Sequence, residues 1–443
     1  MIKNKLPLAL IVLLFFYNSL MLGQTLEIDL QKAQSIALKN NPQYKLAEEA
    51  LSKAKAQITE ARGGMLPSLS AFSQYQRAWV LPTVIFDDPL SDGKIEFKMG
   101  TEHTLVYGLS FQQPIYLGGA IWNAYKMSQS GKLIAEAQLE STRQNVLLQA
   151  TTAYYGLLFS KSVVTVMEQA FATSNENLDQ VHKIRSVGQA SDFDVLRAEV
   201  QVANLKPLLI SANNNTKLAE SRLLMVLGLD NSPKIIAVDS LQFVSNEFSG
   251  LAQNDLYSRA LQARSDIKIM DEQKYIMQKQ VALARSALLP SLVFGTNYQF
   301  QGQRDDFGFT NDDFYKSFNS SFSLSIPLFG GFQTAGKIQQ AKAGVREAEY
   351  QTDALYQAVS LEIETAYLAI NEKEQSVSTQ SKIIDQAAEA LRLARLRYAE
   401  GLSTQLDVMN AEGALNQARM NYQQSLFDYN IAIAQLKKAL NEL

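Results

Sequence analysis

The chain has 443 residues, of which 47% are hydrophobic and 19% are charged, and its formal net charge at pH 7 is −3. This length could accommodate two or three ordinary domains, and the mild charge disfavours nucleic acid or an anionic membrane surface as a partner. The sequence contains no cysteine, which excludes disulfides and thiolate metal sites.

The N-terminal stretch is typical of a secretory signal. Lys3 and Lys5 precede an apolar run over 6–22. The sequence therefore predicts a signal peptide over 1–23 that is cleaved near Gly23. The alternative is an uncleaved membrane anchor, because the run is just long enough to span a bilayer.

The first structural elements are a helix and a strand. Residues 30–62 have a helical pattern rich in Ala, Lys, Glu and Gln. Gly63 and Gly64 end this helix, and Pro67 precedes a strand expected at about 68–82.

A second strand and a very long helix follow. After an acidic loop, residues 104–113 alternate between apolar and polar side chains, and Pro114 with Gly118 and Gly119 closes this predicted strand. From 120 to 187 no proline interrupts a helical pattern, and a helix of that length implies a coiled coil or the wall of a barrel. A return helix is expected over 191–227, with a kink or break at Pro207.

The turn between the two long helices is a recurring motif. Gly188 can adopt a left-handed conformation beyond the first helix, and Ser191 with Asp194 resembles a capping box for the second. Gly401 and Thr404 occupy matching positions later in the chain. The sequence thus predicts two matching helical hairpin tips.

The whole pattern occurs twice. Pro290 precedes a strand at about 292–301, and Pro327 closes another at about 318–326. A second long helix then leads to the tip at Gly401. The sequence therefore predicts a duplicated unit of helix, strand, strand, long helix and helix, with a period of roughly 220 residues. The first repeat is expected over 24–228, a linker over 229–254 and the second repeat over 255–443.

The strands each have one apolar face and one face of Ser, Gln and Asn. This alternation is typical of a transmembrane β-barrel with lipid outside and water inside. Four strands cannot close a barrel, for which about eight is the minimum, so several chains would have to share one. The expected fold is mainly α with a transmembrane β-barrel portion. The alternative is a coiled coil with two small hairpins.

Together, the two tip motifs, the paired Leu-Pro-Ser-Leu segments and the Pro–Gly–Gly strand exits resemble the outer-membrane efflux protein family, the TolC-like channels. The resemblance covers nearly all of the chain after the signal. It implies a homotrimer with a 12-stranded β-barrel in the outer membrane and an α-helical barrel across the periplasm. The linker 229–254 would belong to an equatorial belt.

The resemblance also implies a function. The chain would be the exit duct of a tripartite efflux pump or type I secretion system. Its partners would be outer-membrane lipid, a periplasmic adaptor and, indirectly, an inner-membrane pump. The alternative is a non-conducting structural coiled coil of the periplasm.

The family's motifs map onto particular residues. The resemblance assigns the periplasmic entrance to Asp194, Tyr398, Asp407 and Asn410, although the family has aspartate at the last of these and an arginine where this chain has Ser403. Asp407 could equally act as a helix cap, and Tyr398 could be packing in a coiled coil. The resemblance also assigns adaptor docking to the hairpin tips at Gly188, Ser191, Gly401 and Thr404. It assigns the helix-to-barrel transitions to Pro67, Pro114, Pro290 and Pro327.

Catalytic chemistry is not indicated. His103 and His182 are the only histidines of the sequence, and they lie in different predicted elements. The sequence has no nucleophile elbow, phosphate loop or metal-spaced cluster. It therefore predicts a protein that is not an enzyme and uses no cofactor or metal.

Overall fold

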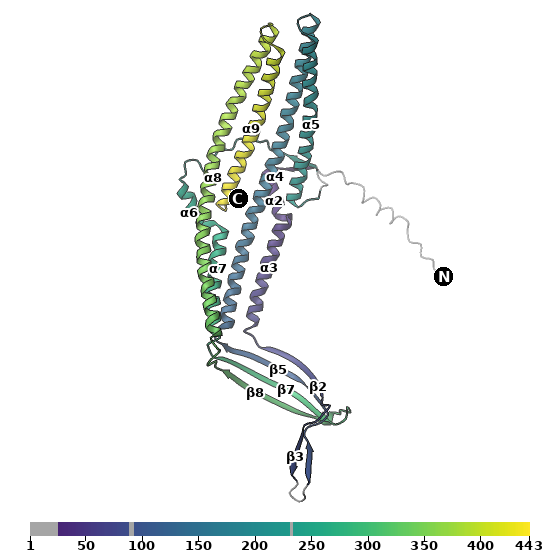
Figure 1. The fold of residues 1–443 in the computed structure, drawn as a ribbon, viewed down its shortest axis with the longest axis vertical. Coiled ribbons are helices and arrows are strands. Elements are labelled where there is room, and N and C mark those ends of the chain that lie inside the picture. Colours follow the sequence, from purple (N-terminus) through teal and green to yellow (C-terminus); the bar gives the residue numbers. More distant parts are fainter. Residues whose placement is uncertain (1–24, 88–92, 231–233) are drawn as a thin grey trace, which may run out of the picture. The chain divides into compact units, whose positions relative to one another are not determined.

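The structure is a computed structural model that describes residues 25–87, 93–230 and 234–443 (Figure 1). The predicted signal peptide over 1–23 lies outside the described residues. The described residues divide between two compact units. The first comprises the described residues up to Glu49, Ala137–Ile267 and Ala354–Leu443, and the second comprises Ala50–Glu136 and Lys268–Asp353.

Helices make up most of the chain. In order, they are α2 (Leu30–Asn40), α3 (Pro42–Gly63), α4 (Ala120–Ser186), α5 (Asp192–Leu227), α6 (Gln253–Ala263), α7 (Ser265–Ser286), α8 (Gln333–Ala399) and α9 (Gln405–Ala439). The long helices α4 and α8 have 67 residues each, which corresponds to roughly 100 Å. Among the helices of the described residues, none has a segment long and apolar enough to cross a membrane.

Within α8, apolar and small residues are spaced by threes and fours over 338–370, a sequence pattern that predicts a covered stripe, the seam, facing a neighbouring helix. Every member of this stripe is buried or half-buried, which confirms the predicted seam. The members are Ile338, Ala341, Val345, Ala348, Thr352, Leu355, Val359, Ile363, Ala366 and Ile370.

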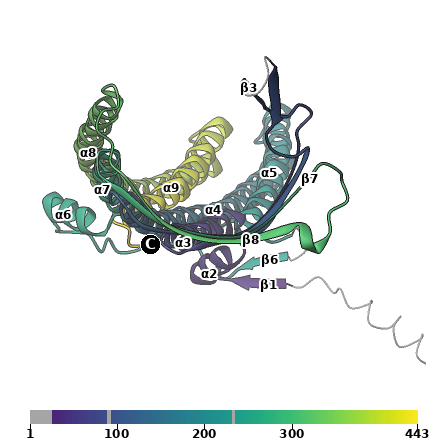
Figure 2. The ribbon, with the colours of Figure 1, turned by 90° about the horizontal axis from the view of Figure 1, so that it is seen from below.

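The strands form three sheets. They are β1 (Thr25–Ile28), β2 (Ser68–Arg77), β3 (Thr83–Asp87), β4 (Lys94–Lys98), β5 (His103–Leu117), β6 (Lys234–Ala237), β7 (Ser291–Arg304) and β8 (Phe314–Ser325). The largest sheet has the order β2-β5-β7-β8 and is antiparallel throughout. Figure 2 shows it as a curved surface. Its two outer strands, β2 and β8, each leave one edge unpaired within the chain.

The strand bounds differ from the predicted ones. The strand expected at about 68–82 ends at Arg77, and the stretch beyond it forms a separate hairpin of β3 with β4. Residues 94–98 alternate Lys-Ile-Glu-Phe-Lys, which is the sequence signal of the missed strand. The strands expected at about 104–113, 292–301 and 318–326 all begin earlier, because pairing with a neighbouring strand extends them beyond the stretch of clean alternation.

The strand end predicted at residue 113, before Pro114, is wrong, and of the kink or break predicted at Pro207 the structure shows no break. Strand β5 continues past Pro114 to Leu117, with a shift of register between Pro114 and Tyr116. A bulge tolerates the missing N–H of proline. Helix α5 runs through Pro207 without a break. Pro207 is exposed, so water can satisfy the carbonyl group that proline leaves unpaired.

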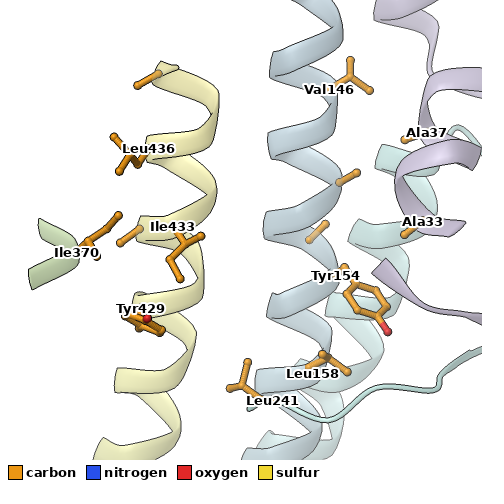
Figure 3. Close-up of a cluster of buried hydrophobic side chains, with 14 of the residues drawn as sticks. Ala33, Ala37, Val146, Tyr154, Leu158, Leu241, Ile370, Tyr429, Ile433 and Leu436 are labelled. Carbon is orange, nitrogen blue, oxygen red and sulfur yellow. The ribbon is translucent and has the colours of Figure 1, made fainter. Parts of the chain in front are cut away.

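The first unit is held together by a hydrophobic core that joins its helices to the linker (Figure 3). Tyr154 of α4 is fully buried and its hydroxyl lies 2.7 Å from a carboxylate oxygen of Asp239. Tyr429 of α9 donates to the Val244 carbonyl at 2.8 Å and stacks on Phe243. The stretch predicted as an irregular linker is therefore packed on the helices, and it contributes β6, which pairs in parallel with β1.

Candidate functional site at the hairpin tips

The two predicted tips have the same backbone geometry. Gly188 and Gly401 have positive φ angles of 79° and 71°. In each, the glycine N–H donates to the carbonyl three residues back, and the next N–H donates to the carbonyl five residues back, at 3.0 Å to Ile184 and 2.7 Å to Arg397. This is the Schellman arrangement, which needs a left-handed residue directly after the helix.

A capping box begins each return helix. At the first tip, the Asp194 N–H donates to Ser191 Oγ at 3.1 Å and the Ser191 N–H donates to Asp194 Oδ2 at 3.1 Å. At the second tip, Thr404 and Asp407 repeat this reciprocal pair at 3.3 and 2.8 Å. The tips are thus closed by hydrogen bonds within five or fewer residues of sequence, and the capping interpretation of both aspartates is confirmed.

The capping hydrogen bonds also lower the pKa values of the two carboxylates. The Ser191 hydroxyl, which donates to Asp194 Oδ2 at 2.6 Å, holds the pKa of Asp194 below its ordinary value. The backbone N–H and the hydroxyl of Thr404 likewise lower the pKa of Asp407. Hydrogen bonds to a carboxylate favour its charged form, so both tips carry a negative charge at neutral pH.

Tyr398 lies between the two hairpins. Its ring packs against a cluster of α4 and α5 residues around Val181 and Val195, and also against a cluster of α8 and α9 residues around Leu391 and Val408. Its hydroxyl is buried without a hydrogen-bond partner in the described part of the chain. Burial raises the pKa of Tyr398, with a smaller contribution from Asp194. Within one chain, then, Tyr398 packs rather than forming a hydrogen bond to Asp194.

A buried ion pair beside Tyr398 was not predicted from the sequence. Glu412 of α9 is 2% exposed, and Arg395 of α8 donates to its Oε1 at 3.0 Å. Burial raises the pKa of Glu412, while Arg395 and Asn177 oppose the rise. Arg395 also lines a cavity of about 360 Å³ between α4 and the second hairpin, together with Tyr398 and Asn177.

The repeated motif predicts a glutamate at this position of each hairpin, but it does not predict which one is buried. Glu199 occupies the position of the first tip that matches Glu412, yet it is exposed. Gln405, the first residue of α9, is 1% exposed, and both polar atoms of its side chain lack partners in the described residues. The burial of Glu412 involves contact with α4, where Asn177 lies against it, and no local pattern reports such a contact.

The other predicted residues lie apart from this cluster. Asn410 is exposed on α9, one turn beyond Asp407. Ser403 bonds locally, donating to the Ala394 carbonyl at 3.4 Å. Pro67 and Pro290 directly precede β2 and β7, whereas Pro114 lies inside β5 and Pro327 follows β8.

We expect Glu412→Gln to change how hairpin stability depends on pH. Because the pKa of Glu412 in the folded chain lies above its ordinary value of 4.5, the folded state holds this proton to higher pH than the unfolded state. Its contribution to stability therefore falls as the pH rises above about 4.5. Thermal unfolding in detergent should show Glu412→Gln gaining stability relative to wild type between pH 5 and pH 8.

The matched control is Glu199→Gln, which removes the equivalent carboxylate from the exposed position of the first hairpin. It measures the general effect of losing one acidic group. A difference between Glu412→Gln and wild type that stays constant over this pH range would contradict the prediction.

The sheet of the second unit has two chemically distinct faces. Its apolar face is well exposed in the single chain, and the register of the four strands puts all of these side chains on one side. They include Leu69, Tyr75, Tyr107, Leu109, Tyr298, Phe318, Phe322 and Leu324. The opposite face is mainly Ser, Gln and Asn. A large exposed apolar face with open edges needs a covering that one chain does not supply.

Capped pairs of long helices joined to such a sheet define the class of the outer-membrane channels. The crystal structure of the CmeC outer membrane channel of Campylobacter jejuni is similar, with a TM-score of 0.77 and 20% identity, and covers 93% of this chain and 85% of that one. The open-state structure of the MtrE outer membrane channel of Neisseria gonorrhoeae has a TM-score of 0.76 and 18% identity, and the match covers 93% of this chain and 88% of that one. These likenesses establish the fold.

The sequence matches the family model described as "Outer membrane efflux protein" over residues 33–229 and 256–442. The chain belongs to the outer membrane efflux protein family. It is 21% identical to the outer membrane protein TolC of Vibrio cholerae, with 92% of this chain and 89% of that protein aligned. It is also 21% identical to the alkaline protease secretion protein AprF of Pseudomonas aeruginosa, with 91% of this chain and 82% of that protein aligned.

Membership of this family confirms the predicted function. The protein is an exit duct of the outer membrane that serves efflux or type I secretion, and it is not an enzyme. The alternative of a non-conducting coiled coil is therefore set aside. In the described residues, no group of His, Asp and Glu side chains is arranged to hold a metal ion.

Proposed function

We propose that three copies of this chain form one continuous duct. The observation that supports this is the four-stranded sheet with an exposed apolar face and two unpaired edges. Unpaired backbone groups in lipid cost several kcal/mol each, and a barrel needs about eight strands or more. Three sheets of four strands give a 12-stranded barrel whose apolar face meets lipid and whose Ser, Gln and Asn face meets water.

The helices of the same three copies would form an α-helical barrel in the periplasm. The linker 229–254 would belong to a belt around it, and the chain would reach the envelope by the signal peptide over 1–23. The repeats over 24–228 and 255–443 would alternate around the axis. Each copy then contributes two hairpin tips of the same backbone geometry.

The tips would form both the entrance and the docking surface. Gly188 and Ser191 at one tip, and Gly401 and Thr404 at the other, would contact a periplasmic adaptor coupled to an inner-membrane pump. Asp194, Asp407, Tyr398 and Asn410 would lie near the periplasmic opening. The names of the relatives fit either cargo class, since AprF is a protease secretion protein and SrpC of Pseudomonas putida is a solvent efflux pump component.

Conductance in planar bilayers tests this proposal. We expect purified wild-type protein to form channels that prefer cations, because carboxylates at a narrow opening concentrate counter-ions. Asp407→Asn removes the charge and leaves an oxygen that can still accept from the Thr404 N–H. It should lower the cation-to-anion permeability ratio by roughly tenfold.

The control is Asp385→Asn, which removes one exposed carboxylate of α8 about 24 Å along the helix from Gly401. It should change selectivity much less. If the selectivity of the channels does not respond to Asp407→Asn, Asp407 does not lie at the entrance. Folded protein that never conducts would overturn the duct itself.

A further inference from the structure

The four strands of the large sheet share one pattern of charge. Each of β2, β5, β7 and β8 contains a single basic residue and no carboxylate. The strand register puts all four basic residues on the apolar face of the sheet, and along these strands the opposite face has no charged side chain. The four are Arg77, His103, Arg304 and Lys316.

The depth of these residues along the sheet can be estimated. In Figure 1 the strands run from the ends of the helices to the β3–β4 hairpin. Arg77 is nine residues from Ser68, which begins β2, and Lys316 is nine residues from Ser325, which ends β8. Nine residues of strand span roughly 30 Å. At the tilt of a membrane barrel, about 35–45°, this height is close to the roughly 25 Å of its apolar band.

Two of the four basic residues already have partners. Arg304 donates to two aspartates of the turn between β7 and β8, at 2.6 and 3.0 Å. His103 is buried, and its Nδ1 lies 2.7 Å from the Tyr75 hydroxyl. Arg77 and Lys316 are both exposed. Among the described residues, Arg304 is the only basic residue of these strands in an ion pair.

Aromatic rings lie beside the two unpaired cations. The Arg77 guanidinium carbon is 4.1 Å from the centroid of the Trp79 ring, and Trp79 is 80% exposed. Lys316 Nζ lies 5.9 Å from the centroid of the Phe300 ring. Exposed aromatic rings at the end of an apolar band are typical of the boundary between lipid and water. Both cations would therefore lie at the level of the lipid headgroups.

We propose that Arg77 and Lys316 bind the phosphate groups of anionic lipids in the outer leaflet. This inference rests on the proposed barrel, which turns the apolar face toward lipid. An arginine can donate two parallel hydrogen bonds to phosphate oxygens, and a lysine binds phosphate as a point charge. The net charge of −3 gives the chain no general attraction to an anionic surface. The placement of these two cations, on a face of the strands without carboxylates, decides the interaction.

Native mass spectrometry of the purified protein in non-ionic detergent tests the inference. The probe is dioleoyl phosphatidic acid, and dioleoylglycerol is the same lipid without its phosphate. We expect wild-type trimers to bind the phosphate-bearing lipid roughly tenfold more tightly or better. Arg77→Gln combined with Lys316→Gln should lower that affinity by about 25-fold, because each basic residue near an anionic lipid contributes roughly fivefold. Binding of dioleoylglycerol should not change.

The matched control combines Lys94→Gln with Lys98→Gln, which removes two exposed positive charges from β4, outside the four-stranded sheet. It measures the effect of net charge alone and should change the affinity by less than about twofold. The charge-conserving variant, Arg77→Lys with Lys316→Arg, keeps both cations and should retain most of the binding. Since Arg77 and Lys316 are exposed, neither set of substitutions removes a buried contact.

The outcomes separate the lipid site from the barrel. Equal losses in the test and control variants would overturn the site, because net charge would then explain the binding. Equal affinity of the wild type for the two lipids would overturn phosphate recognition. Both results leave the proposed barrel standing if the spectra show trimers. Folded protein that stays monomeric would instead overturn the barrel, and the inference with it.

Discussion

Arg395→Ala should destabilise the second hairpin by about 2–3 kcal/mol. Glu412 is 2% exposed, and Arg395 donates to it at 3.0 Å. Removing one partner of a fully buried ion pair costs about 3–5 kcal/mol, because the other charge is left uncompensated. The side chain of Arg395 is 40% exposed, so water partly screens this pair and the effect should fall below that range. Hydrogen exchange of the α8–α9 amides measures it as faster local opening.

Arg392→Ala is the matched control on the same helix. Arg392 donates to Glu389 at 2.8 Å, but the two side chains are 61% and 55% exposed. Exposed ion pairs contribute about 0–1 kcal/mol. Adding Glu412→Gln to Arg395→Ala should restore part of the loss, because the buried charge is then absent. Equal effects of Arg395→Ala and Arg392→Ala would show that the Glu412 contact is not a buried pair.

Gly401→Val should destabilise the second tip by roughly 1–3 kcal/mol. Gly401 has a φ of 71°, and a β-branched residue is strained there even though the space around it is open. The strain would disrupt the turn bond from the Leu402 N–H to the Arg397 carbonyl, which is 2.7 Å long. Since the tips are the proposed docking surface, adaptor binding in detergent should weaken together with the protection of these amides.

Gly413→Ala provides a control of opposite sign. Gly413 lies in the interior of α9, exposed and with open space around it. Alanine in a helix interior is more stable than glycine by roughly 0.5–1 kcal/mol. If both substitutions change stability in the same direction, the left-handed turn at Gly401 is not what limits the tip.

The sequence by itself determined the features that depend on short segments. The caps at Ser191 and Thr404 and the turns at Gly188 and Gly401 involve bonds between residues at most five apart. Such bonds follow from residue type, so the motif predicts them. The seam of α8 and the faces of the strands were predictable for a related reason: the period of each element decides which side chains lie together.

Interruptions and ends of elements were less predictable. Pro114 and Pro207 looked like breaks, but a bulge in β5 and an exposed position in α5 accommodate them. The β3–β4 hairpin was missed because its two strands are short, and a short strand becomes distinct only through its partner. In both cases a neighbouring strand or the solvent decided the outcome.

Only the tertiary structure decided the environment of the tip residues. Glu199 and Glu412 occupy the same place in the repeated motif, yet one is exposed and the other is buried against Arg395. Asn177, which also favours the charged form of Glu412, lies far from it in sequence. Tyr398 likewise joins two clusters from different hairpins. Burial of a charge depends on which helices meet, and that depends on the packing of the whole unit rather than on the residues of one turn.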